Sequence, residues 1–287
     1  MYRVAILGCE NSHANFFLDY ILKNKKVDDV EVVGIYSNEA EAAQKLQDAY
    51  GVYVAEAYDE FVGKIDGLII TARHGDNHYK YAKPYIESGI PMFIDKPITV
   101  SEQDAVAFME ELKSHKIRIS GGSMCKYAGK VQELKKLVQS QEKGKVLGGY
   151  LRAPISMENK YGGFFFYSQH LVQVMCEIFG CNPKSVQVFT KGDVYTCVFR
   201  YDAYDVIGEY VNANYLYAAS VSLENGFLGG EYGTEQCSEQ EFAAFYRILK
   251  GGEQEMSYAD FAAPVFILNG IHRSMESGRE EAIQYGL

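Results

Sequence analysis

The chain has 287 residues, a formal net charge of −10 and a hydrophobic fraction of 47%, which is enough material for two domains of ordinary size. An acidic surface repels phosphate backbones, so we expect no nucleic-acid partner. No apolar run approaches the ~18–20 residues of a membrane span, so we expect no membrane partner either.

The first 121 residues alternate short apolar runs with stretches of helical periodicity. Each run is apolar throughout, which is typical of strands buried on both faces of a parallel sheet. Gly51 and Gly89 follow two of the helical stretches and are expected to end those helices. The pattern predicts an α/β domain with a Rossmann-type, doubly wound parallel sheet over residues 1–121. Its expected strands are 4–7, 31–36, 67–71, 91–94 and 117–120, and its helices follow residue 11 and cover 40–50, 77–88 and 101–114.

From residue 122 onward the pattern changes to longer strands rich in Tyr and Val, separated by Gly, Asp and Asn turns. Consecutive strands joined by short turns pair antiparallel, so residues 122–287 are predicted to form an α+β domain with an open, mostly antiparallel sheet. One face of this sheet is expected to pack on helices, and the Tyr-studded face to join copies into a homodimer or homotetramer. We also expect the last helix to pack back on the first domain. The expected strands are 146–153, 186–190, 194–201, 206–211 and 215–222, and the helices are 129–141, 169–179, 240–249 and 261–276.

The six cysteines are scattered, without a Cys-x-x-Cys pair or a zinc-ligand spacing. In a chain of this size such a pattern is typical of reduced, mostly buried thiols. Residues 1–10 also lack the longer apolar segment of a secretory signal peptide. We therefore expect a cytoplasmic protein.

Lys96 follows an apolar strand directly and precedes Pro97, which restricts the backbone there. In an open α/β sheet, ligands bind at the carboxyl ends of the strands. A lysine at this place, partly desolvated beside Asp95, can donate a proton to a substrate oxygen or neutralise an anion. The alternative is a surface lysine at a strand end.

Five short patterns follow one another along nearly the whole chain. They are Leu-Ile-Ile-Thr at 68–71 with His78 after it, Phe-Ile-Asp-Lys-Pro at 93–97, Gly-Lys-Val-Leu-Gly at 144–148, Gly162-Gly163 with His170 after it, and the small-residue ending of 271–278. In this order the patterns resemble the Gfo/Idh/MocA family of NAD(P)-dependent oxidoreductases.

The resemblance implies that Lys96 stands where the cofactor's nicotinamide meets the substrate and that His170 takes the hydroxyl proton as hydride leaves. A neutral imidazole near pH 7 suits that task. The chain departs from the family pattern around His170, because Phe166 and Gln173 stand where acidic residues are usual and Ser168 where glycine is usual. A helix-entry histidine bonded to a backbone carbonyl is the alternative.

The loop after the first strand, Gly8-Cys-Glu-Asn-Ser-His13, departs further from the pattern. A dinucleotide-binding turn uses glycine at three places, and here Glu10 and His13 occupy the second and third. A carboxylate at the second place opposes a diphosphate with like charge. Asn11 or Ser12 is expected to cap the following helix, whose free N–H groups at Ser12 and His13 can bind an anion. Three interpretations stay open: the cofactor lies differently, Glu10 turns away, or the ligand is not a dinucleotide.

The second strand ends in Tyr36-Ser37-Asn38, without the acid typical of NAD enzymes and without an arginine for a 2′-phosphate. The cofactor is therefore expected to be NAD or NADP without a stated preference. The Arg73–His78 segment follows another strand, and a metal bound by His74 and His78 was weighed against cofactor contacts; no metal is expected. The predicted cofactor-binding residues are Gly8, Glu10, Asn11, Ser12, His13, Ser37, Asn38, Thr71, Arg73, His74, His78 and Asp95.

The predicted catalytic residues are Lys96 and His170, and the predicted substrate contacts are these two with Lys126 and Tyr127. The resulting hypothesis is an enzyme that transfers hydride to or from a secondary hydroxyl or ketone of a sugar, polyol or related small metabolite. Two alternatives remain: a ligand-binding or regulatory member that has lost hydride chemistry, and a non-redox lyase or isomerase acting on a sugar.

Overall fold

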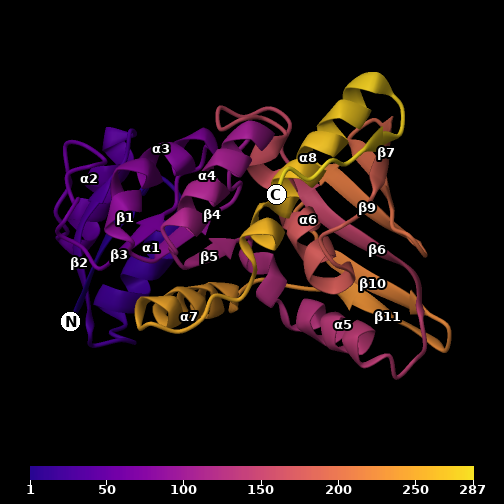
Figure 1. Cartoon of the computed structure of the whole chain (residues 1–287), viewed down its shortest axis with the longest axis horizontal. Coiled ribbons are helices and arrows are strands. Elements are labelled where there is room, and N and C mark those ends of the chain that lie inside the picture. Colours follow the sequence, from indigo (N-terminus) through magenta and orange to yellow (C-terminus); the bar gives the residue numbers. More distant parts are fainter. The chain divides into compact units, whose positions relative to one another are not determined.

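The computed structural model describes all 287 residues, which divide into two compact units (Figure 1). Unit 1 comprises residues 1–99, 103–122 and 238–258, and unit 2 comprises 100–102, 123–237 and 259–287. The last helix, which we expected on the first domain, is part of unit 2 over most of its length. The segment that returns to unit 1 is 238–258 instead. None of the helices combines the length and the apolar character needed to cross a membrane.

Unit 1 contains a five-stranded parallel sheet in the order β2-β1-β3-β4-β5, which confirms the predicted doubly wound fold. Every residue of β3 and β4 is buried, as expected for strands covered on both faces. The strands are β1 (Tyr2–Leu7), β2 (Val30–Tyr36), β3 (Gly67–Ile70), β4 (Met92–Asp95) and β5 (Ile119–Gly122). The helices are α1 (Ser12–Leu18), η1 (Asp19–Lys23), α2 (Ala40–Tyr50), α3 (Asp76–Ala82), η2 (Lys83–Ser88), α4 (Glu102–Ser114) and α7 (Cys237–Leu249).

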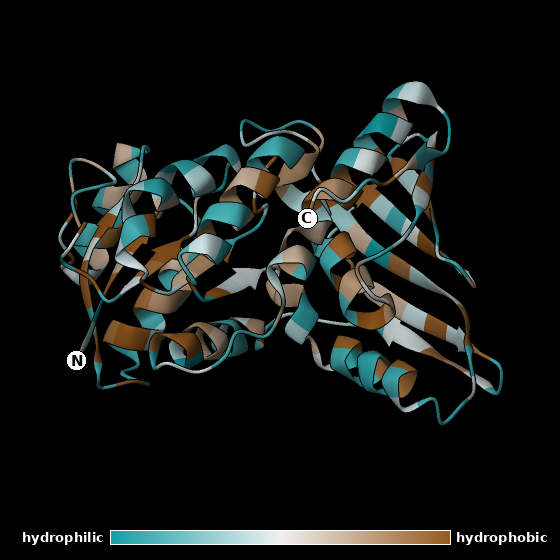
Figure 2. Ribbon diagram, in the orientation of Figure 1, coloured by the Kyte–Doolittle hydropathy of each residue, from teal (hydrophilic) through white to brown (hydrophobic).

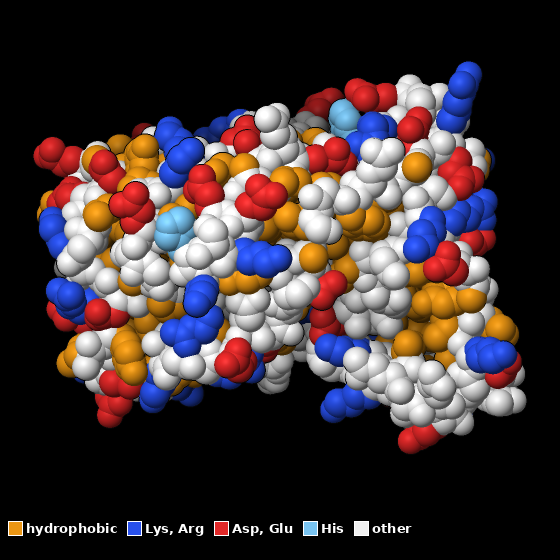
Figure 3. Space-filling view, in the orientation of Figure 1, with side chains coloured by type: hydrophobic (Ala, Val, Ile, Leu, Met, Phe, Trp, Pro, Cys, Tyr) orange, Lys and Arg blue, Asp and Glu red, His pale blue; other side chains and the backbone are white.

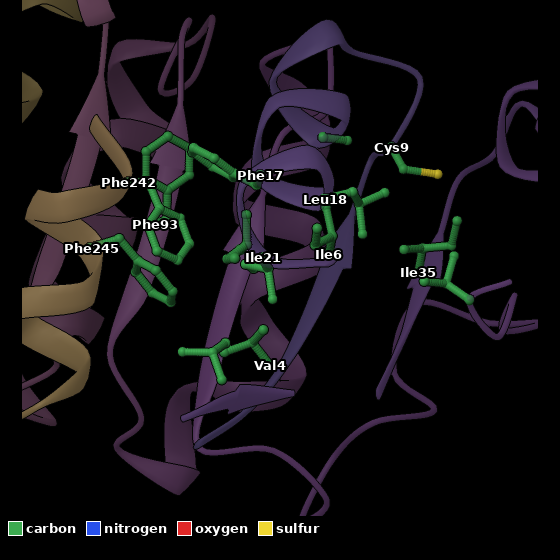
Figure 4. Close-up of a cluster of buried hydrophobic side chains, with 14 of the residues drawn as sticks. Val4, Ile6, Cys9, Phe17, Leu18, Ile21, Ile35, Phe93, Phe242 and Phe245 are labelled. Carbon is green, nitrogen blue, oxygen red and sulfur yellow. The ribbon is translucent and has the colours of Figure 1, made fainter. Parts of the chain in front are cut away.

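One aromatic cluster joins α1 and α7 to the sheet of unit 1. The ring of Phe17 on α1 lies edge-on to Phe93 on β4, with centroids 5.0 Å apart. Phe242 and Phe245 on α7 pack on the same pair, as Figure 4 shows. Burial of such rings contributes about 1.5–3 kcal/mol for each fully buried large apolar side chain. A helix more than a hundred residues downstream of the sheet therefore completes one face of its core.

Unit 2 contains a seven-stranded sheet in the order β11-β10-β6-β9-β8-β7-β12. All neighbouring strands are antiparallel except β6 and β9, so the prediction of an open, mostly antiparallel sheet is confirmed. Its strands are β6 (Val146–Ile155), β7 (Ser185–Lys191), β8 (Val194–Arg200), β9 (Asp205–Asn212), β10 (Ala218–Leu223), β11 (Gly226–Glu231) and β12 (Glu281–Ala282). Its helices are η3 (Met124–Tyr127), α5 (Gly129–Ser140), α6 (Phe165–Phe179) and α8 (Tyr258–Ser277).

Helix α6 covers one face of this sheet at very close range. A Cβ at Gly149 on β6 would lie 2.1 Å from the Phe179 ring, and one at Gly208 on β9 would lie 2.9 Å from Leu171. Glycine is therefore needed at both strand positions for the helix to approach. Hydrophilic and hydrophobic residues alternate along these strands (Figure 2), so the opposite face carries a different set of side chains.

Two differences from the predicted elements concern the glycine-rich end of unit 2. The predicted strand at 215–222 begins at Ala218, and β11, Gly-Phe-Leu-Gly-Gly-Glu, was not predicted. Three glycines in six residues carry little strand propensity, so the pairing with β10 decides this element.

Candidate functional site

Gly8 is the residue at which the chain leaves β1. Its φ is +79°, and a Cβ there would lie 2.4 Å from the backbone of Ala72, so no other residue fits without displacement. Its N–H donates to the Tyr36 carbonyl at 2.8 Å, and its carbonyl accepts from the Thr71 hydroxyl at 3.0 Å. The one glycine kept from the predicted loop thus joins the end of β1 to the ends of β2 and β3.

The carboxylate of Glu10 is bonded to residues at the ends of both strands that flank β1. Oε2 accepts a hydrogen bond from the Ser37 hydroxyl at 2.6 Å, and Oε1 accepts one from the backbone N–H of Arg73 at 3.0 Å. Ser37 is in turn held by the N–H of Glu39 at 3.0 Å, whereas Asn38 is exposed. Glu10, Ser37 and Arg73, all predicted cofactor residues, therefore form one group at the carboxyl edge of the sheet.

Asn11 is the N-cap of α1, which confirms one of the two predicted caps. Its Oδ1 accepts from the N–H of His13 at 3.3 Å, and its Nδ2 donates to Asp95 Oδ2 at 2.7 Å. The side chain of Asn11 is buried, whereas Ser12 is exposed. The cap occupies one of the N–H groups that the sequence suggested for anion binding, so Asn11 acts here as a link between α1 and β4.

His13 lies buried between two carboxylates. Its Nδ1 is 2.9 Å from Glu241 Oε2 on α7 and 3.7 Å from Asp95 Oδ1. Burial alone lowers the pKa of this imidazole, but Asp95 and Glu241 together outweigh it and raise the pKa from 6.5 to about 8. Sequence reasoning did not find Glu241, because 228 positions separate it from His13 and no local pattern connects them.

The ligand atoms of His13, Asp95 and Glu241 all lie within 4.8 Å of one another, a spacing that metal sites share. The 2.9 Å separation of His13 Nδ1 and Glu241 Oε2 is that of a direct ion pair, which Asp95 and Glu241 favour by raising the pKa of the imidazole. We therefore interpret the group as a buried charge network.

Lys96 is buried directly after β4, with 4% of its surface exposed. Its backbone N–H donates to Asp95 Oδ1 at 2.7 Å, and the Asp95 carboxylate is held on its other oxygen by Asn11. The bond from Lys96 to Pro97 is cis. Lys96 is therefore placed by a chain of contacts that runs from the loop after β1 through Asp95.

The two histidines of the Arg73–His78 segment lie in different surroundings. His78 is fully buried, with its ring nitrogens 2.8 Å from the Ala72 carbonyl and 3.2 Å from that of Ile98. Burial lowers the pKa of His78, so the neutral ring is favoured. His74 is half-buried, and its Nδ1 accepts from the Asp76 N–H at 3.3 Å. The two imidazoles have separate partners, and the position of His78 indicates support of the loop.

The predicted site residues of unit 2 gather around His170 on α6. The Ser123 hydroxyl lies 2.7 Å from His170 Nδ1, and Cys125 Sγ lies 3.4 Å from the same atom. Ser123 also caps η3 by accepting from the N–H of Cys125 at 3.2 Å. The acids expected near His170 are absent from the sequence, and a serine hydroxyl orients the ring instead. Ser123 was missed because it lies 47 residues before His170.

Tyrosine rings surround His170 within unit 2. Tyr167 is edge-on to it with centroids 5.0 Å apart, and Tyr217 is edge-on at 6.1 Å. Tyr217 and Tyr232 also line an open pocket of about 600 Å³ together with Tyr215. Such rings offer flat apolar faces beside polar hydroxyls, a combination suited to a polyhydroxylated ligand.

Lys126 and Tyr127 form the end of η3. Lys126 is buried, with 3% of its surface exposed, and its Nζ lies 4.9 Å from the centroid of the Tyr127 ring. The Gln132 side chain donates to the Lys126 carbonyl at 2.6 Å. Lys126, Tyr127 and His170 belong to unit 2, whereas Lys96 belongs to unit 1.

The two units therefore combine a Rossmann-type parallel sheet with a mostly antiparallel sheet. Residues 2–123 match the model of the GFO_IDH_MocA family, described as an oxidoreductase family with an NAD-binding Rossmann fold. Residues 2–123 are thus similar to the Gfo/Idh/MocA family, and the resemblance seen in the sequence is confirmed over these residues.

In sequence, only part of the chain matches individual proteins, whereas in fold nearly the whole chain superposes on solved structures. An inositol 2-dehydrogenase of Corynebacterium glutamicum is 30% identical over 111 residues, which are 38% of this chain and 33% of that protein. The chain spans at most 41% of the curated relatives it matches. The structure of a myo-inositol dehydrogenase from Corynebacterium glutamicum superposes with a TM-score of 0.84 at 17% identity and 99% coverage of both chains. A myo-inositol 2-dehydrogenase from Lactobacillus plantarum gives a TM-score of 0.85 at 15% identity and the same coverage.

Proposed function

We propose that the chain is an NAD(P)-dependent oxidoreductase acting on a secondary hydroxyl, or in reverse a ketone, of a sugar, polyol or related small metabolite. The observation that carries the proposal is Lys96, a buried lysine fixed at the carboxyl end of a strand in a Rossmann sheet. The description of the matched family and the names of the inositol dehydrogenases similar to this chain support it.

The loop after β1 fits a dinucleotide better than its sequence suggests. Gly8 keeps the tight bend and the close contact with Ala72. The carboxylate of Glu10 is held by Ser37 and the Arg73 N–H, at the ends of the neighbouring strands. We propose that these residues, with Asn38, hold the adenosine half of the cofactor. When bound, the nicotinamide accepts or donates the hydride.

We propose that Lys96 and His170 handle the proton. The Lys96 ammonium hydrogen-bonds the substrate oxygen that becomes the carbonyl. His170 takes the hydroxyl proton, and we assign this task to Nε2 because Nδ1 contacts Ser123. The Ser123 hydroxyl keeps the ring in one orientation. In the reductive direction the same atoms return the proton.

Tyr167, Tyr217 and the tyrosine-lined pocket support a sugar or polyol as the substrate class. The C–H faces of a cyclic polyol pack on aromatic rings, while its hydroxyls reach the phenol groups. Lys126 and Tyr127 are the proposed further substrate contacts.

The test titrates the pure chain with NADH and NADPH by nicotinamide fluorescence and then measures oxidation of a panel of inositols and other polyols. We expect micromolar binding of at least one cofactor. Lys96→Ala is expected to lower kcat by roughly 10²–10⁴-fold and to change the cofactor Kd by less than about threefold, because it removes a proton-handling group.

Lys64→Ala, which removes an exposed lysine of the same unit, is the matched control and should leave both quantities unchanged. If neither NADH nor NADPH binds at millimolar concentration, the proposal is contradicted and a non-catalytic ligand-binding protein is favoured. Cofactor binding with full turnover in Lys96→Ala would remove Lys96 from the mechanism.

A further inference from the structure

We propose that Glu10 selects the cofactor, because its carboxylate binds the adenosine ribose diol of NAD and excludes the 2′-phosphate of NADP. This inference rests on the proposed function and adds a preference that the end of β2 leaves open.

Glu10 brings a carboxylate to the end of β2, where the strand itself runs into Tyr36, Ser37 and Asn38. Because β1 lies between β2 and β3, Glu10 reaches Ser37 on one side and Arg73 on the other, with bonds of 2.6 and 3.0 Å. In dinucleotide-binding folds an acid near the end of the second strand holds the ribose hydroxyls. Here that strand continues into Ser37 and Asn38. The carboxylate needed at the strand end is delivered from the loop after β1.

The hydrogen bonding of Glu10 matches a vicinal diol. A carboxylate offers about four acceptor positions on its two oxygens. Ser37 and the Arg73 N–H account for one position on each oxygen, which leaves each oxygen able to accept once more. The ribose of NAD donates two neighbouring hydroxyls. Glu10 is half-buried, so a ligand can reach it, and its two existing bonds fix it before the ligand arrives.

A 2′-phosphate on the ribose both removes a hydrogen-bond donor to Glu10 and repels its carboxylate. It replaces one of the two hydroxyl donors and adds a charge of about −1.5 to −2 beside an anion. The Arg73 backbone N–H donates to Glu10 without adding a positive charge to the contact. We expect NADH to bind at least about 100-fold more tightly than NADPH, the scale of one unit-charge repulsion in a partly exposed site.

The first experiment uses the full-length wild-type chain and measures the Kd of NADH and NADPH by fluorescence, with ADP-ribose and 2′-phospho-ADP-ribose compared by calorimetry. A preference of about 100-fold for the unphosphorylated member of each pair supports the inference. Equal affinities, or tighter NADPH, would overturn the role of Glu10 while leaving the proposed function intact. Absence of binding by all four ligands would overturn both.

The second experiment compares Glu10→Gln with Glu41→Gln. Gln has the same shape as Glu. Its amide oxygen can accept from the Arg73 N–H, and its amide NH₂ can donate to the Ser37 hydroxyl, but the negative charge and one acceptor oxygen are lost. The ratio of the two Kd values should fall to less than about fivefold, with weaker NADH and stronger NADPH binding. Glu41 is exposed on α2, so its variant removes the same charge nearby and should keep the wild-type ratio.

Circular dichroism establishes that both variants are folded. If Glu10→Gln does not fold, Ser37→Ala takes its place, because it keeps the charge and frees one acceptor position. Because the carboxylate and its bond to the Arg73 N–H remain in Ser37→Ala, NADH should still bind at least about tenfold more tightly than NADPH. Equal affinities in this variant would overturn the inference.

Discussion

Two residues replace loop glycines in this chain, and both have specific polar partners. Glu10 is bonded to Ser37 and Arg73, and His13 lies 2.9 Å from the Glu241 carboxylate. Buried or partly buried charges are costly unless they are paired, so these contacts are required by the substitutions themselves. In this loop, side-chain contacts stand where a dinucleotide-binding loop usually has glycines.

The contact between Ser123 and His170 predicts a kinetic effect at the residue scale. Ser123→Ala removes the 2.7 Å contact that orients the imidazole, and we expect kcat to fall by roughly 10–100-fold with little change in KM. The decrease should appear in kcat rather than in KM, because the hydroxyl acts on the orientation of the ring. Steady-state kinetics from pH 6 to 9 measures both.

Ser123→Thr, which restores a hydroxyl, should recover much of the activity, and Ser140→Ala on the exposed end of α5 serves as the control. An unchanged kcat in Ser123→Ala would show that the hydroxyl has no part in positioning His170.

At the scale of elements, α7 does two things for unit 1. Its apolar side, with Phe242, Phe245, Ile248 and Leu249, is part of the core around β1 and β4. The same helix places Glu241 against His13. Because one helix supplies both, a rearrangement of α7 would change the charge network beside Lys96 as well as the packing of the sheet.

This network predicts how stability depends on pH. The pKa of His13 is about 8 in the folded chain and about 6.5 when unfolded, so the stabilisation is fully present below pH 6.5 and is lost as the pH rises through 8. Asp95 and Glu241 raise this pKa, and Lys96 opposes them. We expect the free energy of unfolding to fall by about 2 kcal/mol between pH 6 and 9. Urea unfolding followed by circular dichroism at both pH values measures it.

In Glu241→Gln the difference between pH 6 and pH 9 should shrink, because one of the two carboxylates that raise the pKa is gone. Glu239→Gln, at an exposed position on the same helix, should behave as the wild type. If all three proteins show the same pH dependence, the His13–Glu241 pair is not its source.

For the whole molecule, the open face of the sheet in unit 2 is the surface on which we propose that a second copy packs. Val198 pairs with Ile207 on this face, opposite the α6 side, and the two side chains are half-buried. Phe189 and Phe227 are exposed on the same face, at 53% and 71%.

On the face of the molecule in Figure 3, acidic, basic and apolar side chains are interspersed, without a continuous basic stripe.

We expect light scattering after size-exclusion chromatography to give the mass of a dimer or tetramer, and Val198→Asp to give a monomer, because a charge would be buried at the contact. Tyr53→Asp, at an exposed tyrosine of unit 1, is the control and should keep the wild-type mass. A monomeric wild-type chain would exclude this assembly.

The elements of unit 1 were predictable because their signals are local. Buried parallel strands are apolar throughout, helices have a period near 3.6 residues, and Gly51 and Gly89 adopt the positive φ that ends a helix. The position of Lys96 at a strand end follows from the same local pattern. β11 was missed because its glycines carry no such signal, and its pairing with β10 forms it.

The sequence by itself indicated the alternating strands and helices of residues 1–121, the change of pattern after them, the resemblance to the family and the single glycine where a dinucleotide loop usually has three. Only the tertiary structure decided the partners of these side chains: Glu10 is bonded to Ser37 and Arg73, and His13 contacts Glu241. The contact between Ser123 and His170 is likewise visible only in the structure. Local structure depends on neighbours a few residues apart, which a pattern displays. Contacts across 27 to 228 positions depend on which strands adjoin and which helix returns, and packing alone decides those.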